Sequence, residues 1–467
     1  MAGSAGAGAR FDFSPRPPER PRDPRRWWYR RQVRRPSSLT LLTLAFAVVA
    51  CAKRPAPVFL VLLDIVPVEN RAYTEWARRA LEDFRRETGI AVERQLPPQF
   101  TDEQLALERR ILEGRGTTPD VFVVDAIAPG TLADHLLDLA PHFERERGRH
   151  FPGLVANNVV RGRLVAIPYH ANVGILLYRS DLLRTYGLTH PPASWDELAS
   201  MAAAIQAGER RRGRADFWGY VWQGAPYEGL TCNALEWQAS EGGGRILEDD
   251  GAISVNNPRA RRAWARAASW IGTISPPEVI GFREVEAEDA WLGGRAAFLR
   301  SWPGTALATW NEGPLRGRFD IAPLPGGTGG RAGTLGENAL AVSRYSVHPT
   351  EAVALVRYLS RADVQRARSR VTSVPPTIAA VYDDPGVLAA HPYYLRLREV
   401  FQAGIVSRPS AVAGDKYAEV SRSYFRAVHS VLTREKTAET AGTDLERELE
   451  WITGLPARTG DAAGASP

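Results

Sequence analysis

Two hydrophobic patterns alternate along the first part of the chain. Residues 57–66 (PVFLVLLDIV) form a near-continuous apolar run, which is typical of a strand buried on both faces of a parallel sheet. Residues 71–87 instead show helical spacing, with an apolar stripe formed by Trp76, Ala80, Leu81 and Phe84. Gly89 follows directly, and glycine is common just after a helix end. The pattern predicts a strand and then an amphipathic helix.

The alternation continues over most of the chain. Further strands are predicted at 90–95, 121–125, 164–168, 174–178, 319–325 and 338–342. Further helices are predicted at 102–112, 197–207, 350–359 and 416–432. Ser194 and Glu197 form a capping box at the start of the second of these helices. Alternating strands and helices predict an α/β fold, with parallel-rich sheets flanked by helices.

The chain length indicates more than one folding unit. The chain has 467 residues, more than one hydrophobic core comfortably holds, so we expect two domains or lobes. After Gly454 the composition turns to Gly, Ala and Pro, and residues 456–467 are expected to form a disordered tail.

The N-terminal segment has the order of a secretory signal. A block rich in arginine precedes the apolar run 39–50, which ends in Val48-Val49-Ala50-Cys51. A cysteine at this position resembles the lipobox of bacterial lipoproteins, in which the thiol is lipidated and the cysteine becomes the first residue. This interpretation assigns 1–50 to a signal peptide, Cys51 to lipidation and 51–57 to a linker.

Two other interpretations of the apolar run were weighed. A transmembrane helix needs about 20 residues, and this run has 12. A buried core helix is disfavoured by the arginines before the run and by Pro55 and Pro57 after it. The basic region is long for a signal, and a translation start nearer Val33 would leave a compact one.

Charge argues against a nucleic-acid partner. The formal net charge of the chain is +6, and residues 1–50 alone contribute +7, so the part from Cys51 onward carries −1. This remainder lacks the basic surplus typical of nucleic-acid binding. Cys232 is the only cysteine besides Cys51, so an intrachain disulfide is not expected once Cys51 is lipidated.

Sequence motifs for catalysis and metal binding are missing. The chain has no H-E-x-x-H, no G-x-S-x-G and no P-loop, and its eight histidines lack metal-ligand spacing. We therefore expect no metal, no cofactor and no enzymatic activity. A carboxylate pair for glycoside hydrolysis stays open, because it is defined by a distance in space.

Tryptophan is frequent, with 13 residues. Trp218, Trp222 and Trp237 lie near polar residues, and Trp302 precedes a Pro-Gly pair. A flat apolar ring beside hydrogen-bonding groups suits a sugar, although such rings are also ordinary core residues. Both interpretations stay open for Trp302 and for the 222–228 segment.

A series of short motifs appears in a characteristic order after Cys51. The series is TPDVF (118–122) with Asp125, PY (168–169), GILLYRSDLL (174–183), PPASWDEL (191–198), FWGYVWQG (217–224), YEGL (227–230), SEGG (240–243), GRAAF (294–298), SWP (301–303), APLPG (322–326) and RP (408–409). In this order the chain resembles the extracellular solute-binding proteins, family 1, of carbohydrate ABC importers, and among them the trehalose/maltose-binding type.

The resemblance implies a two-lobed periplasmic-binding-protein fold of type II with a ligand cleft between the lobes. Lobe I would comprise 58–170 and 319–373, and lobe II 171–318 and 374–455. Hinges are expected near 168–172, 321–325 and 373–377, where lobe closure on a ligand would bend the chain.

The resemblance also implies a function. The protein would be an extracytoplasmic lipoprotein that captures a di- or oligosaccharide and delivers it to a membrane permease with a cytoplasmic ATPase. It would act as a monomer, anchored to the cell membrane through Cys51 in the periplasm or on the outer face. The alternative class is an extracellular carbohydrate-active enzyme using a carboxylate pair.

Residues carried over from the family define a candidate site. Asp125, Trp302 and Arg408 match sugar-contacting positions, and Tyr227 and Glu228 lie in a matching segment. Asn172 stands where relatives have Asp, His170 replaces a Tyr, and Glu337-Asn338 replace a Gly-Trp pair. These departures leave open another oligosaccharide, a polyol or a glycerol-phosphate-type ligand.

Overall fold

The computed structural model describes residues 58–66, 70–98, 101–304, 310 and 313–458. These residues belong to one compact unit, Ala56–Pro467. The predicted signal 1–50 and Cys51 lie outside the described residues. No helix in the described part is long and apolar enough to cross a membrane.

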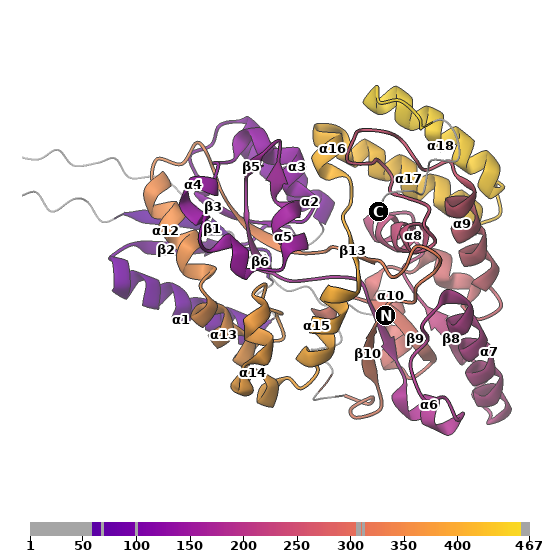
Figure 1. The fold of residues 1–467 in the computed structure, drawn as a ribbon. Coiled ribbons are helices and arrows are strands. Elements are labelled where there is room, and N and C mark those ends of the chain that lie inside the picture. The colour runs from indigo at the N-terminus through magenta and orange to yellow at the C-terminus, as the bar shows by residue number, and fades with distance from the viewer. Residues whose placement is uncertain (1–57, 67–69, 99–100, 305–309, 311–312, 459–467) are drawn as a thin grey trace, which may run out of the picture. The chain divides into compact units, whose positions relative to one another are not determined.

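The first sheet has five strands in the order β2-β1-β3-β12-β6 (Figure 1). The strands are β1 (Phe59–Leu63), β2 (Ala91–Gln95), β3 (Val121–Asp125), β6 (Ile167–His170) and β12 (Asn338–Val342). Strand β1 pairs in parallel with β2 and β3, whereas β12 is antiparallel to both of its neighbours. Strand β12, which comes late in the sequence, therefore lies between β3 and β6.

Helices pack on this first sheet. Trp76 and Phe84 of α1 share an apolar cluster with Leu60 of β1, as the predicted stripe required. The helix ends where Gly89 adopts a left-handed φ of 79°. The elements of this part also include α1 (Arg71–Thr88), α2 (Thr101–Glu113), α3 (Ala128–Leu132), α4 (Ala140–Phe143), α5 (Pro152–Asn157), β4 (Val159–Val160), β5 (Arg163–Leu164), α12 (Pro349–Leu359) and α13 (Ala362–Val371).

The second sheet has four strands in the order β10-β7-β9-β8. The strands are β7 (Ile175–Tyr178), β8 (Trp218–Val221), β9 (Ala296–Ser301) and β10 (Asp320–Pro323). Here β7 is antiparallel to both neighbours, and β8 is parallel to β9. Each sheet thus has one reversed strand within an otherwise parallel set, and the parallel-rich prediction holds.

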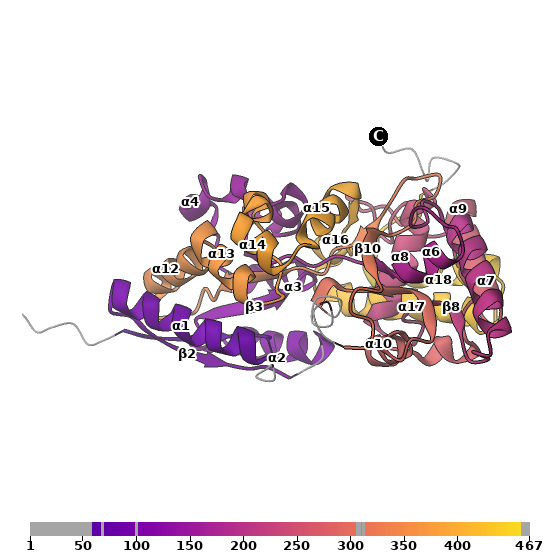
Figure 2. The ribbon, with the colours of Figure 1, turned by 90° about the horizontal axis from the view of Figure 1, so that it is seen from below.

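Long helices surround the second sheet (Figure 2). Ser194 caps α7 by accepting from Glu197 N at 3.2 Å, as predicted, and the helix extends beyond the expected end. The helices are α6 (Ser180–Thr185), α7 (Trp195–Arg211), α8 (Glu228–Ser240), α9 (Pro258–Trp270), α10 (Glu284–Leu292), α17 (Tyr417–Leu432) and α18 (Ala438–Thr453).

The chain crosses between the two sheets more than once. It passes from β6 to β7 through 171–174 and returns from β10 to β12 through 324–337. Strand β10 lies in the second sheet, although the lobe I assignment began at 319. Later elements follow α13, namely α14 (Pro385–Ala390), α15 (Tyr394–Ala403), β13 (Ile405–Val406), which pairs with β11 (Gly333–Thr334), and α16 (Ser410–Ala413).

The start of the expected tail is bonded to the fold. Ile253 N donates to Pro456 O at 3.0 Å, and Arg458 N donates to Ile253 O at 2.9 Å. Arg458 also forms an ion pair with Asp250 at 2.5 Å. Residues 456–458 are therefore bonded to the rest of the fold, and residues 459–467 lie outside the described residues.

Candidate functional site

A cavity of about 680 Å³ combines residues of the first sheet with residues of helices that flank the second sheet. This volume lies within the usual range for small-molecule sites. Its lining consists of Thr101, Leu105, Ala106, Arg109, Asp125, Ile127, Asn172, Pro226, Tyr227, Glu228, Gly229, Cys232, Arg283, Glu284, Val285, Trp302, Gly336, Asn338, Arg408, Tyr417, Ala418, Ser421, Arg422 and Phe425.

Asp125 is placed by the end of a buried strand. The run VFVV of β3 is fully buried, and Asp125 follows it with its side chain 19% exposed. Its Oδ1 accepts from Ile127 N at 3.2 Å, which fixes the carboxylate at the strand end. Ligands of open α/β sheets bind at the carboxyl ends of strands, and Asp125 has that location.

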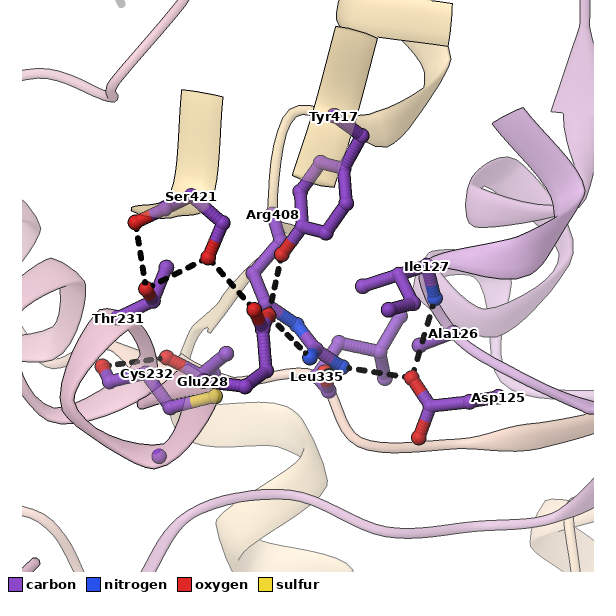
Figure 3. Close-up of polar contacts among 12 residues, drawn as sticks. Asp125, Ala126, Ile127, Glu228, Thr231, Cys232, Leu335, Arg408, Tyr417 and Ser421 are labelled. Carbon is purple, nitrogen blue, oxygen red and sulfur yellow. Dashed lines mark hydrogen bonds and ion pairs between the residues drawn. The ribbon is translucent and has the colours of Figure 1, made fainter. Parts of the chain in front are cut away.

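Arg408 joins two carboxylates at the centre of the polar wall (Figure 3). It forms ion pairs with Asp125 at 3.1 Å and with Glu228 at 2.8 Å, while its own side chain is only 4% exposed. Its Nη2 also lies 3.3 Å from Leu335 O. Burial disfavours the charged guanidinium, but its acidic neighbours outweigh this, so the pKa of Arg408 lies well above its ordinary value.

Both carboxylate oxygens of Glu228 accept hydrogen bonds from side chains of α17. Tyr417 donates to the Oε1 that also receives Arg408, and Ser421 Oγ donates to Oε2 at 2.6 Å. Thr231 in turn lies 2.8 Å from Ser421 Oγ (Figure 3). Burial and the Glu228 charge raise the pKa of Tyr417 well above its ordinary value, so its hydroxyl stays a donor. Glu228 therefore acts chiefly as the anchor of Arg408.

An aromatic pair forms another part of the wall. Tyr227 OH donates to Glu284 Oε2 at 2.6 Å, and Trp302 Nε1 makes a long contact of 3.5 Å with Glu284 Oε1. The guanidinium of Arg300 lies 4.0 Å from the Trp302 ring centroid. The rings supply apolar faces beside a carboxylate, a combination suited to a polyhydroxylated ligand.

Asn172 and Asn338 contribute amides to the cavity. The Oδ1 of Asn172 is buried and has no hydrogen-bond partner among the described residues. Its backbone carbonyl accepts from Gly336 N at 3.0 Å. Asn338 is paired with Asp125 in the sheet register, which brings these two side-chain positions together.

His170 and Glu337 do not line the cavity. His170 is 4% exposed and stacks on Tyr169 with ring centroids 4.1 Å apart. Burial lowers its pKa well below the ordinary value. Glu337 is fully buried and accepts from Asn157 and Asn158, and burial raises its pKa well above the ordinary value. Direct ligand contact by these two residues stays a prediction.

Trp222 and Trp237 are core residues. Both are completely buried and meet edge to face at 5.0 Å, and Trp222 Nε1 donates to Ser275 at 3.1 Å. The core interpretation therefore holds for these two rings. Among the tryptophans considered for the site, Trp302 is the one that lines the cavity.

Sequence reasoning missed several residues of the wall. Glu284, Tyr417 and Ser421 were not among the candidates, and Cys232 lines the cavity as well. Burial raises the pKa of the Cys232 thiol to about 12, so it stays neutral. The one available signal was helical spacing, since Tyr417 and Ser421 are four residues apart and share a face of α17.

The geometry defines a binding protein for a polar small molecule. Carboxylates, amides and aromatic rings converge on one cavity between two α/β sheets, each flanked by helices. No group of three or more potential metal ligands occurs among the described side chains.

Comparison with known proteins identifies the family. A sequence model of the bacterial extracellular solute-binding proteins matches residues 79–392. A probable ABC transporter-binding protein of Deinococcus radiodurans is 42% identical over 416 residues, covering 88% of this chain and 97% of that protein. The chain belongs to the bacterial extracellular solute-binding protein family.

Solved structures share the fold. Maltose-bound MalE3 of T. maritima has a TM-score of 0.75 and 33% identity, over 85% of this chain and all of the other. The GacH receptor of Streptomyces glaucescens has a TM-score of 0.71 and 21% identity, over 85% of this chain and 98% of the other. These likenesses confirm the two-lobed periplasmic-binding-protein fold of type II.

Proposed function

We propose that this protein captures a sugar in the cavity between its lobes and delivers it to an ABC importer. The observation that carries the proposal is the cavity wall, where Trp302 and Tyr227 present rings beside Asp125, Asn172 and Asn338. Sugars offer a C–H face for the rings and hydroxyls for the polar groups. The maltose bound by the similar T. maritima protein supports a sugar ligand here.

A di- or oligosaccharide is the ligand class we propose. A cavity of about 680 Å³ is large for a single small polyol. By the resemblance to the trehalose/maltose-binding type, Asn338 stands where relatives would carry a tryptophan, and it lines the cavity with an amide. The site thus gains a hydrogen-bonding group at that position and relies on Trp302 and Tyr227 for stacking.

The proposed partners follow from this role. The ligand-bound protein would dock as a monomer on permease subunits coupled to a cytoplasmic ATPase. Lipidated Cys51 would tether the protein outside the cytoplasmic membrane, through the linker 51–57. A ligand that contacts both lobes favours their closed arrangement, which offers the permease a surface to recognise.

A ligand screen tests the proposal. Purified protein is heated with maltose, trehalose, maltotriose, acarbose, tagatose or ribitol, and ligands that shift the melting temperature are titrated by calorimetry. A bound ligand at a hundredfold excess over Kd stabilises the native state by about 2.7 kcal/mol. Absence of binding to every sugar, with the protein folded, would overturn the proposal.

The same samples separate binding from turnover. A carbohydrate-active enzyme would release shorter sugars, whereas a binding protein returns the ligand unchanged. We expect chromatography of each bound sugar after long incubation to show no product. Steady product formation would replace the importer role with the enzymatic alternative.

A further inference from the structure

The Glu284 carboxylate touches both aromatic residues of the cavity wall. One oxygen receives the Tyr227 hydroxyl at 2.6 Å, and the other faces the indole nitrogen of Trp302 at 3.5 Å. Tyr227 and Trp302 come from different parts of the chain, and Glu284 is the residue through which they are connected.

Helix α10 places the carboxylate precisely. Glu284 is the first residue of α10, where the partial positive charge of the helix start favours a negative side chain. At this start the backbone N–H of Arg283 donates to Glu286 Oε2 at 2.8 Å. One turn later, Ser301 Oγ donates to Glu288 at 3.1 Å, which ties the helix to the end of β9.

Each of the two aromatic rings also contacts an arginine side chain. Arg300, fully buried, lies 4.0 Å from the ring centroid of Trp302 and is held by Glu236 at 2.5 and 3.0 Å. Arg283 lies 4.9 Å from the ring centroid of Tyr227. Each ring therefore has a guanidinium on it and the shared carboxylate at its polar atom.

We propose that Glu284 is a positioning residue that fixes Tyr227 and Trp302 as one preformed sugar-binding surface. The inference rests on the proposed sugar-binding function and deepens it. Both carboxylate oxygens already have partners within the wall, so Glu284 acts on the ligand through the two rings.

The expected effect follows from the cost of ordering side chains. Immobilising a free side chain at a binding surface costs conformational entropy, and Glu284 removes this cost for two rings. Loss of the carboxylate should therefore weaken sugar binding roughly tenfold, since about 1.4 kcal/mol corresponds to a factor of ten. Burial and the Glu284 charge also raise the pKa of Tyr227, which keeps its hydroxyl protonated as the donor.

The first experiment uses the sugar-free protein and so does not depend on the ligand. Acrylamide quenching is measured for Glu284→Ala and for Asp289→Ala, a control that removes an exposed carboxylate from the same helix. Each is compared with its own Trp302→Phe version, and the difference isolates the Trp302 signal. We expect higher quenching of Trp302 in Glu284→Ala and an unchanged value in the control. Equal quenching in both would overturn the inference.

The second experiment measures coupling in binding. Calorimetry with maltose, or with the sugar that gives the largest thermal shift, compares Glu284→Ala, Tyr227→Phe and the double variant. If Glu284 acts through Tyr227, the fold-loss of sugar affinity in the double variant should be far smaller than the product of the fold-losses in the two single variants. Glu284→Gln, which retains one acceptor oxygen, should lie between wild type and Glu284→Ala.

The outcomes separate the two proposals. A folded wild-type protein that binds no sugar contradicts the proposed function, while the quenching result still judges the role of Glu284. A wild-type protein that binds sugar, with independent effects of the two substitutions and unchanged Trp302 quenching, contradicts the inference alone.

Discussion

Arg408 is the residue on which the polar wall depends. It forms ion pairs with both Asp125 and Glu228, two carboxylates that lie 103 positions apart in sequence and that come from the first sheet and from α8. A buried charge left without its partner is strongly destabilising. Arg408 therefore has a structural role, and the sugar contact expected of it stays a prediction. Only its Nε lacks a partner among the described residues.

Breaking this bridge should cost stability as well as affinity. We expect Glu228→Gln to lower the unfolding free energy by about 2–3 kcal/mol, because it leaves the Arg408 charge less compensated. Asp125→Asn should lower it less, since Glu228 still holds the guanidinium. Denaturant melts measure both. Wild-type stability in Glu228→Gln would contradict the bridge, and Arg408→Lys, which cannot span both carboxylates, should also weaken sugar binding.

Trp302 should separate binding from folding. We expect Trp302→Ala to reduce sugar affinity by a factor of ten or more while the protein stays folded, because this ring lines the cavity. The control Trp237→Ala removes a completely buried ring and should cost about 3–5 kcal/mol of stability instead. Calorimetry and thermal melts on both variants decide. A large loss of stability with unchanged affinity in Trp302→Ala would assign this ring to the core.

Glu337 makes stability depend on pH. Its folded pKa lies well above the ordinary value of 4.5, so between 4.5 and the folded pKa the native state holds more protons than the unfolded chain. Stability contributed by this group is complete below pH 4.5 and falls as pH rises. Glu337→Gln should therefore melt higher than wild type at pH 7, with the gain vanishing at pH 4. A gain independent of pH would contradict this account.

At the scale of elements, the segment that joins β6 to β7 packs against the ion pair of Glu236 and Arg300, and Arg300 in turn contacts the Trp302 ring. A Cβ on Gly174 would lie 2.0 Å from Glu236 Oε1 and 2.8 Å from Arg300 Nη2, inside the fully buried ion pair. Gly174→Ala should therefore cost about 3 kcal/mol and weaken sugar binding. Gly148→Ala, where a Cβ meets nothing within 4 Å, is the control. Equal melting temperatures for Gly174→Ala and Gly148→Ala would contradict the close packing of Gly174 against the ion pair.

Elements with a clear hydrophobic pattern could be predicted from the sequence. The continuous apolar runs of β1 and β3 and the stripe of α1 fix element type locally. The observed bounds equal those expected for β3, differ by one residue at the end of α1, and differ by two and three residues at the ends of β1. The reversal of β12 within the first sheet could not be predicted, because its apolar run is compatible with either direction. Register and direction depend on partners far away in sequence.

The candidate site was predictable only in part, for the same reason. Asp125 and Arg408 match family motifs, but nothing local shows that the two side chains meet 3.1 Å apart. Glu337 and His170 belong to segments that were expected to form the site, yet both side chains are buried, with exposed fractions of 0% and 4%. Glu284 belongs to no motif, and its role depends on packing between α10 and β9.

At the scale of the whole molecule, membrane attachment is the open prediction. We expect Cys51→Ser to abolish lipidation, so that the protein is no longer recovered with the membrane fraction. Fractionation and mass spectrometry of the mature N-terminus measure this. Unaltered membrane recovery of an uncleaved Cys51→Ser chain would instead favour a signal anchor. Sugar affinity in the isolated protein should be the same for both forms.

The position of β12 in the first sheet also bears on the timing of synthesis. Strands β3 and β6 are complete at residue 170, but the strand between them ends at Val342. At translation rates of about 5–20 residues per second, the nascent chain waits roughly 10–30 s with the edge of β3 unpaired. An unpaired edge invites association with other chains, so this interval calls for a holding chaperone or for transfer out of the cytoplasm before the sheet can close.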